Sequence, residues 1–546
     1  MKLRQMNNKN IVTLIGLVVI TIFFSFQSRF FEIAKQIEIY NNLFKELNIN
    51  YIDEINPGDL TDKAIKNTLK NLDPYTNFYN EQDVEDARIR REGEYGGIGV
   101  LSYYTKKGII LSEIYKGFSA DKAGLKAGDI IVNVDGQELK DLEREQLSQM
   151  LKGTPNKEIS LKVVRGSKNL IFNLKLDKVV VNPVPFYDMI DAETGYVVLT
   201  RFTSMKATEE VRKAIKNLKE QGMKKLVFDL RSNPGGSLLD AVNITNLFIP
   251  RDKKVVDTRG KIKKNSRSYK TNREPLDIEM PMVVLIDDRS ASASEIVSGA
   301  LQDYDRAVVM GNRSFGKGLV QRYFKLNYGT QMKVTISKYY TPSGRCIQEL
   351  DYANRDAKTG KVPSFSEGVI NKFTTENGRP VYDGGGVTPD VSLEHAEKNK
   401  TIKDLLKSRA VFNFVTDYLK TKPVVDSLRF KFTKPKLEDF KTYLLTVDTT
   451  FLTKEERIFK RAYKVSKEKV EIDSDYKSIV RKLKQAKIKK LEENDEILLN
   501  EIEKEIIKRS FYKEGMYKHQ LKNDVTIKKA TALLKNKNKY NTILKK

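Results

Sequence analysis

The sequence predicts a multidomain α/β protein with helical segments at both ends. The chain has 546 residues, too many for one hydrophobic core. Short β-like runs separated by glycines fill residues 92–180, and strands alternate with amphipathic helices over 181–395. Helical patterns occupy 29–91 and 396–546. We therefore expect these modules to follow one another along the chain.

Residues 1–28 are typical of an export signal. Lys2, Arg4 and Lys9 precede an apolar run over 11–26, the pattern of a signal peptide or signal anchor. The run is slightly shorter than the ~20 residues of a full span, and no clear small-residue cleavage site follows it. An uncleaved membrane anchor is favoured over a cleaved signal. Both predict a cell-envelope protein on the periplasmic side of the inner membrane.

Residues 29–91 are expected to be helical, because apolar residues recur at helical spacing before the turn at Asp73-Pro74. In 92–180, five β-like runs surround two helical stretches, which predicts a small β-barrel with two helices. In 181–395, the apolar strands 225–230 and 281–287 each lead through a turn of small residues into a helix. This alternation predicts an α/β layer with crossover helices.

Residues 396–546 form a basic helical module in this interpretation, with the potential to dock an adaptor or to self-associate. The whole chain has 98 Lys and Arg against 72 Asp and Glu, a formal net charge of +26. The lysines are spread along its length without a nucleic-acid motif, so we expect solvated faces and no nucleic-acid partner. The single cysteine, Cys346, excludes an intrachain disulfide and a multi-cysteine metal site. We expect no metal or cofactor.

The turn SASAS (290–294) follows a buried strand and opens a helix. A serine there lies at the sheet edge, where the helix N-terminus supplies positive potential for a developing oxyanion. Helix capping alone would explain a single such serine. The residues by themselves leave Ser290, Ser292 and Ser294 open as the nucleophile.

A serine nucleophile needs a general base, and histidine is the common one. The two histidines, His395 and His519, both lie in the C-terminal part, so we do not expect a Ser–His–Asp triad. A buried neutral lysine is the other solution, and Lys317 lies between two glycines in SFGKGLVQ (314–321). The turn DLRSNPGG (229–236) can present backbone N–H groups to a carbonyl oxygen. A phosphate-binding loop is the alternative, but the order GxxxxGK[ST] is missing.

These segments together resemble the C-terminal processing peptidases, or tail-specific proteases, of serine peptidase family S41. Further matching motifs are LDPYTNFY (72–79), YYTPSGRCIQ (339–348) and GGGVTPDV (384–391). The resemblance covers residues 30–395 and more weakly the helical tail. It implies an α/β serine peptidase core with an inserted β-rich PDZ domain.

The resemblance also implies roles for single residues. Ser292 would be the nucleophile and Lys317 the general base of a Ser–Lys dyad that works through an acyl-enzyme. Gln321 would help to orient the lysine, and Asp303 would have a supporting role. The amide of Ala293 and the glycine turn would form the oxyanion hole. Pro234 stands where the family often has a further glycine, so the donor from the turn stays open between Gly235 and Gly236.

The segments YGGIGV (95–100) and SADKAGLKAGDIIVNVDG (119–136) resemble a PDZ domain. They imply capture of substrate tails by β-augmentation, with Gly97, Ile98 and Gly99 at the terminal carboxylate. We therefore expect a serine endopeptidase that cleaves exported polypeptides with a free C-terminus. The alternative is a catalytically silent PDZ scaffold or adaptor of the envelope. A nucleic-acid-binding helical tail is a second alternative.

Overall fold

The computed structural model describes residues 30–204, 206–393, 399–466, 468 and 470–546, in two units that divide after Phe78. The predicted anchor at 1–28 lies outside these residues. Among the helices that the structure places, none combines the length and apolar character needed to cross a bilayer. In the first unit a helix covers 30–50, and Asn56 caps α2 (Pro57–Lys70) through its side chain. Strand β1 (Asn77–Tyr79) spans the division.

The β-rich module follows α3 (Glu81–Glu92). Its antiparallel sheet has the order β3-β4-β5-β7-β8, with β6 beside β5. Buried side chains such as Ile109, Ile131 and Leu161 form its core. A separate ladder pairs β2 with β9 where the chain enters and leaves the module. The elements are β2 (Glu94–Gly97), β3 (Val100–Thr105), β4 (Gly108–Ile114), α4 (Ser119–Lys122), β5 (Ile130–Val134), β6 (Gln137–Glu138), α5 (Arg144–Gln149), β7 (Glu158–Arg165), β8 (Lys168–Lys175) and β9 (Asp177–Val180).

The α/β core is built on a sheet of order β10-β11-β12-β15-β16-β21, parallel except between β10 and β11. Its helices follow its strands, so the ends of β12 and β15 lead into the two glycine- and serine-rich turns. The elements are β10 (Phe186–Met189), β11 (Thr194–Val198), α6 (Lys206–Glu220), β12 (Lys225–Asp229), α7 (Leu238–Thr245), β15 (Met282–Ile286), α8 (Ala293–Asp303), β16 (Val308–Gly311) and β21 (Val391–Ser392).

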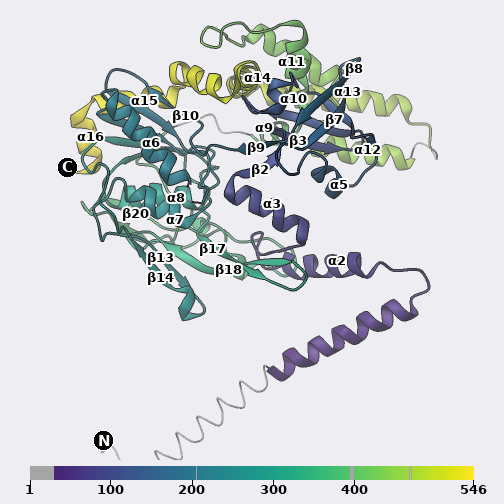
Figure 1. Cartoon of the computed structure of the whole chain (residues 1–546), viewed down its shortest axis with the longest axis horizontal. Helices are drawn as coiled ribbons and strands as arrows, with labels where there is room; N and C mark the ends of the chain where they lie inside the picture. Colours follow the sequence, from purple (N-terminus) through teal and green to yellow (C-terminus); the bar gives the residue numbers. More distant parts are fainter. Residues whose placement is uncertain (1–29, 205, 394–398, 467, 469) are drawn as a thin grey trace, which may run out of the picture. The chain divides into compact units, whose positions relative to one another are not determined.

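Both faces of this sheet are covered, which explains why its strands are continuous apolar runs. Val284 and Phe228 face α6, α7 and α8. Their neighbours Val283 and Val227 face the opposite way and pack against Ile527 and other apolar residues of α15 (Val525–Lys535) and α16 (Lys537–Leu544). The last two helices of the chain therefore form the second covering layer of the α/β core (Figure 1).

A smaller antiparallel sheet, with the path β17-β18-β13-β14, carries the segment that follows Lys317. Its strands are β13 (Lys254–Gly260), β14 (Arg267–Lys270), β17 (Leu319–Lys325) and β18 (Gln331–Tyr340). A hairpin pairs β19 (Lys372–Thr374) with β20 (Pro380–Tyr382). Short 3₁₀ turns cover Lys263–Asn265, Tyr352–Asn354 and Phe365–Glu367.

The helical module has its own core, in which Phe414 and Phe440 pack with Leu498, Ile502 and Ile506. Its helices are α9 (Lys400–Lys407), α10 (Ala410–Thr421), α11 (Lys434–Thr446), α12 (Lys454–Ser466), α13 (Asp473–Glu492) and α14 (Asp495–Asn523). The predicted multidomain α/β fold is confirmed.

Candidate active site

The turn between β15 and α8 separates its three serines by burial. Ser290 and Ser294 are fully buried, and their hydroxyls donate to the carbonyl oxygens of Leu230 at 2.8 Å and Asn233 at 2.9 Å. Ser292 is only half-buried. Its φ of 56° and ψ of −111° lie in a region that non-glycine residues rarely adopt and that occurs at functional turns.

A buried carboxylate, Glu295, joins this turn to the loop that carries Lys317. Its Oε2 accepts the backbone N–H groups of Ser292 at 2.7 Å and Lys317 at 3.0 Å. Its Oε1 accepts the Ser314 hydroxyl at 2.6 Å and the Gly316 N–H at 2.7 Å. One carboxylate oxygen therefore fixes the main chains of both predicted dyad residues.

The glycines beside Lys317 allow its loop to pack closely. Gly316 has a φ of 82°, and a Cβ there would lie 2.5 Å from the Cβ of Glu349. The N–H of Gly318 donates to the side chain of Gln348 at 2.7 Å. Lys317 itself is half-buried and lies just before β17. The backbone N–H groups of Gly316 and Gly318, on either side of Lys317, are therefore both held by side chains, which fixes the loop around the lysine.

Two other predicted residues have partners away from the serine turn. The Gln321 amide, on β17, donates across the hairpin to Thr335 at 3.3 Å. Asp303 ends α8, at the opposite end of that helix from Ser292. There it accepts the buried Arg345 guanidinium and the N–H of Ser343, both at 2.9 Å. Asp303 therefore secures the segment 343–345, while the orienting role of Gln321 stays a prediction.

The glycine turn after β12 lies directly against the serine turn. Gly235 has a φ of 93°, and a Cβ on it would lie 2.8 Å from the Ala293 nitrogen. The N–H of Gly235 donates to the Asn233 side chain at 2.9 Å. Gly236 has a φ of 146° and pairs with Phe202 in an isolated parallel bridge. A side chain at either glycine would collide with its neighbours.

Asn233, which the sequence analysis did not single out, fastens the two turns together. Its side-chain amide donates to Leu199 O at 2.7 Å and its side-chain oxygen holds Gly235. Its own carbonyl accepts the Ala291 N–H at 3.0 Å and the Ser294 hydroxyl. Glu295 was missed as well. Both polar residues are fully buried, as expected of groups that position a rigid site.

Ile98 of the predicted tail-binding loop lines a cavity of about 440 Å³. The carbonyls of Ile98 and Gly99 accept the N–H groups of Ala120 at 3.0 Å and Tyr115 at 2.9 Å. Gly97 ends β2, where it pairs with β9. Apolar side chains from β3 and α5 and their flanks line the cavity: Ile98, Val100, Leu101, Leu147 and Leu151.

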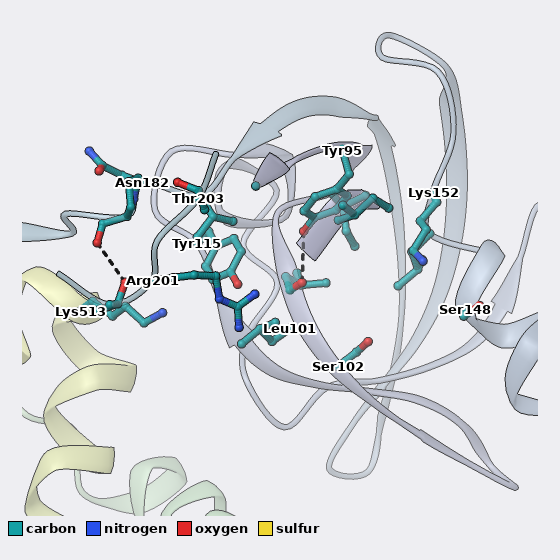
Figure 2. A pocket seen from close by; sticks show the side chains of 18 of the residues that line it. Tyr95, Leu101, Ser102, Tyr115, Ser148, Lys152, Asn182, Arg201, Thr203 and Lys513 are labelled. Carbon is teal, nitrogen blue, oxygen red and sulfur yellow. Dashed lines mark hydrogen bonds between the residues drawn. The ribbon is translucent and has the colours of Figure 1, made fainter. Parts of the chain in front are cut away.

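Other modules also contribute to this cavity. Arg201 of the α/β core and Lys513 of α14 reach it from outside the β-rich module (Figure 2). Lys513 pairs with Glu113 at 3.0 Å. The cavity therefore combines an apolar groove with basic side chains at its rim. Among the described residues, no group of His, Cys, Asp and Glu is arranged to hold a metal ion.

Replacing Glu295 by glutamine is expected to disturb both loops at once. The new NH₂ group cannot accept hydrogen bonds, and hydrogen bonds to a charged group contribute about 1.5–3 kcal/mol each. A shift of either loop by ~1 Å is enough to lower kcat about 100-fold. Peptide hydrolysis and urea unfolding would measure the two effects. Glu503→Gln, which changes a buried carboxylate of the helical module, should destabilise the fold while keeping kcat.

The same variant should change the pH dependence of stability. Burial raises the pKa of Glu295 to about 7, although its four hydrogen bonds favour the ionised form. Because this folded pKa exceeds the ordinary value, ionisation lowers the free energy of unfolding as the pH rises from about 4.5 to about 7. We expect Glu295→Gln to remove this part of the decline. An identical pH dependence in both proteins would contradict the assignment.

Comparisons with known proteins find matches for the β-rich module, the α/β core and the helical module. The chain matches the sequence profiles of a PDZ domain over 86–164, of peptidase family S41 over 193–354, and of "Probable PDZ-protease, C-terminal helical domain" over 401–534. The "Carboxy-terminal-processing protease" of Bartonella bacilliformis is 31% identical over 318 residues, which are 58% of this chain and 73% of that protein. A "Probable CtpA-like serine protease" of Staphylococcus aureus is 32% identical over 310 residues, 56% of this chain and 61% of that protein. Among solved structures, a photosystem II D1 C-terminal processing protease aligns with 26% identity and a TM-score of 0.36, over 65% of this chain and 92% of its own.

Proposed function

The chain belongs to peptidase family S41, as a serine peptidase of the carboxy-terminal-processing type, and on that premise we propose that it cleaves polypeptides with a Ser292–Lys317 dyad. The observation that carries the assignment is the shared Glu295 oxygen, which holds the backbone N–H groups of both residues. The burial of Ser290 and Ser294 favours Ser292 as the nucleophile.

In the proposed reaction the neutral amine of Lys317 takes the hydroxyl proton of Ser292 as Oγ attacks the scissile carbonyl carbon. The C–N bond breaks, Lys317 gives the proton to the leaving amine, and an acyl-enzyme remains. A water molecule, deprotonated by Lys317, then attacks the ester and releases the acid. The serine recovers its proton in that step, so the enzyme is unchanged at the end.

We assign the two oxyanion donors to the N–H groups of Ala293 and Gly236. Ala293 opens α8, so its amide lies at the positive end of a helix. Within the glycine turn, the amide of Gly235 already donates to Asn233. This contact favours Gly236 as the second donor and gives Gly235 the task of allowing close approach.

We also propose that the PDZ domain captures the free C-terminus of the substrate. The apolar groove between β3 and α5 suits a terminal apolar side chain, and the loop Gly97–Ile98–Gly99 suits the carboxylate. The exposed Arg201 at the rim adds positive charge beside the groove. The proposed partners are therefore polypeptides with an unblocked tail.

Matched peptides with a free or an amidated C-terminus test this proposal. Loss of the charged terminus removes charge-assisted hydrogen bonds, so kcat/KM should fall about 10- to 100-fold for the amide. Mass spectrometry would identify the fragments, and Ser292→Ala protein provides the blank. Equal cleavage of both peptides would show that the enzyme does not recognise the free C-terminus. Binding without any cleavage by the wild-type protein would instead favour the silent scaffold.

The location proposed for the enzyme is the cell envelope, with residues 1–28 as anchor or cleaved signal. The support is the basic and apolar pattern of those residues alone. Fractionation of cells that produce the full chain should place an anchored form with the inner membrane and a cleaved form in the soluble periplasmic fraction. N-terminal sequencing of the recovered protein distinguishes an anchor from a cleaved signal.

A further inference from the structure

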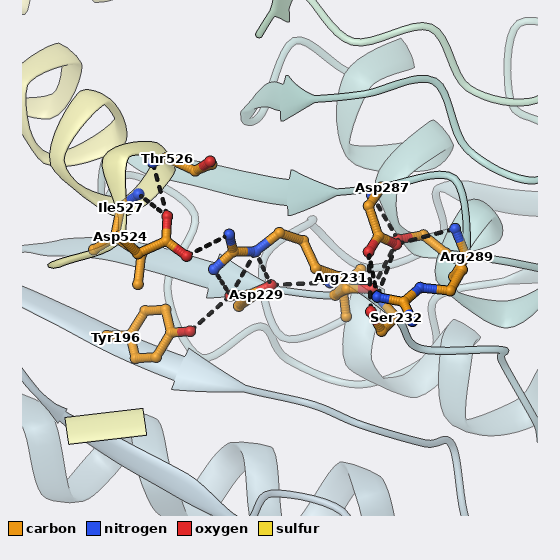
Figure 3. Close-up of polar contacts among 11 residues, drawn as sticks. Tyr196, Asp229, Arg231, Ser232, Asp287, Arg289, Asp524, Thr526 and Ile527 are labelled. Atoms are coloured by element: carbon orange, nitrogen blue, oxygen red, sulfur yellow. Dashed lines mark hydrogen bonds and ion pairs between the residues drawn. The ribbon is translucent and has the colours of Figure 1, made fainter. Parts of the chain in front are cut away.

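Arg231 joins the peptidase core to the chain that follows the helical module. Its guanidinium contacts the Asp229 carboxylate at 2.6 Å and, through Nη1, the Asp524 carboxylate at 2.8 Å. Asp229 also accepts the hydroxyl of the fully buried Tyr196 at 2.6 Å. Figure 3 shows this row of side chains running from Asp524 through Arg231 toward the serine turn. Arg231 and Asp524, 293 positions apart in the sequence, thus belong to one partly buried cluster.

The main chain around Arg231 leads directly to the proposed site. The carbonyl of Leu230 accepts the Ser290 hydroxyl. Ser232 donates its N–H to Asp287 at 2.7 Å, and Asp287 also accepts the N–H of Arg289. The segment 230–232 therefore holds the start of the serine turn and continues into the glycine turn. Displacement of Arg231 would be transmitted to both.

Asp524 is placed to hold Arg231 from the far side. It lies between α14 and α15, and its Oδ1 caps α15 by accepting the N–H groups of Thr526 and Ile527. Its Oδ2 is left to bind Arg231. Burial works to raise the pKa of Asp524, but the Arg231 charge and hydrogen bond lower it, so the carboxylate is ionised at neutral pH.

We propose that Asp524 is a positioning residue for catalysis, which acts through Arg231 to fix the main chain of both oxyanion-forming turns. The proposal rests on the proposed function of Ser292 and of the glycine turn. Asp229 also binds Arg231, but it lies only two residues earlier in the chain, at the end of β12. The bond to Asp524 supplies a second fixed point, which sets the direction of the guanidinium and shields its charge. The peptidase site is thereby completed by a residue outside its own sequence profile.

Asp524→Asn separates this role from helix capping. Asparagine caps helices as well as aspartate does, so α15 keeps its start, while the charge opposite Arg231 is lost. We expect kcat for a free-tail peptide to fall about 10- to 100-fold, as a small displacement of the turns would produce, while KM changes less than about twofold. The tail groove, which sets KM in this scheme, is untouched by the change.

Lys535→Ala is the matched control. It removes the 2.8 Å pair of Lys535 with Asp191, which also links α15 to the α/β core but does not touch either turn. Its kcat should equal that of the wild type. Circular dichroism would fix a temperature at which all variants are folded. If Asp524→Asn does not fold, Asp524→Ser, another capping residue too short to reach Arg231, replaces it.

The outcomes separate the two levels of the proposal. A low kcat in folded Asp524→Asn with normal Lys535→Ala supports the positioning role. Wild-type kcat in a folded Asp524 variant, or an equal loss in Lys535→Ala, overturns it. An inactive wild type, or an active Ser292→Ala protein, would reject the proposed function itself.

Discussion

Replacing Ser292 by alanine is expected to lower kcat by about 10⁶-fold while the protein stays folded. The change removes the only atom that forms the acyl-enzyme in the proposed scheme, and the half-buried hydroxyl contributes little to packing. Residual hydrolysis would come from substrate binding and the oxyanion donors alone. Mass-spectrometric cleavage assays and thermal unfolding of the same samples measure both effects.

Ser290→Ala and Ser294→Ala are the matched controls for this prediction. Each loses a buried hydrogen bond to a backbone carbonyl, and Ser290→Ala also removes the oxygen that accepts the Asp287 N–H at 2.9 Å. Because these bonds help to hold the two turns, we expect each variant to lose about 1–3 kcal/mol in the free energy of unfolding and about 10-fold in kcat, a far smaller loss of activity than in Ser292→Ala. Loss of activity in folded Ser294→Ala together with an active Ser292→Ala would reassign the nucleophile.

Lys317→Arg is expected to be as inactive as Lys317→Ala, with kcat lowered about 10⁴-fold. Arginine has a side chain of similar length, but it stays protonated at any pH that the fold survives and so has no neutral form that can accept a proton. A general base must release and accept that proton, so charge alone cannot restore the reaction. Hydrolysis of a free-tail peptide by samples shown to be folded by circular dichroism measures the effect.

Lys325→Arg provides the comparison, because Lys325 lies at the exposed end of the same strand, β17. Its activity should match the wild type. Substantial hydrolysis by folded Lys317→Arg would exclude proton transfer by this residue. It would leave Lys317, at most, a role in electrostatic stabilisation.

The sequence predicts the α/β core well because its strands are unambiguous. Continuous apolar runs such as 282–286 are buried on both faces and can only be central strands. The same runs do not say which segment covers each face. The covering helices α15 and α16 begin more than 200 residues after that strand, and their apolar spacing resembles that of any amphipathic helix. Their place on the sheet needed the structure.

The candidate site was predictable where a local motif carries it. Ser292 and Lys317 lie in strand–turn patterns with glycines and small residues, and their roles follow from resemblance. Glu295 was hidden because serine followed three residues later by glutamate is the ordinary pattern of a capping box. Its contact with Lys317 depends on the approach of a separate loop. The pair of Arg231 and Asp524 has no local signal, since only the fold brings them together.

The position of α15 and α16 also predicts how a shortened chain would behave. Without these helices, Tyr196, Val227, Val283 and Leu285 would be exposed on one side of the central sheet. That sheet carries both turns of the proposed site, so a fragment cut before residue 525 would lose one covering layer of the sheet and present an apolar face that favours aggregation.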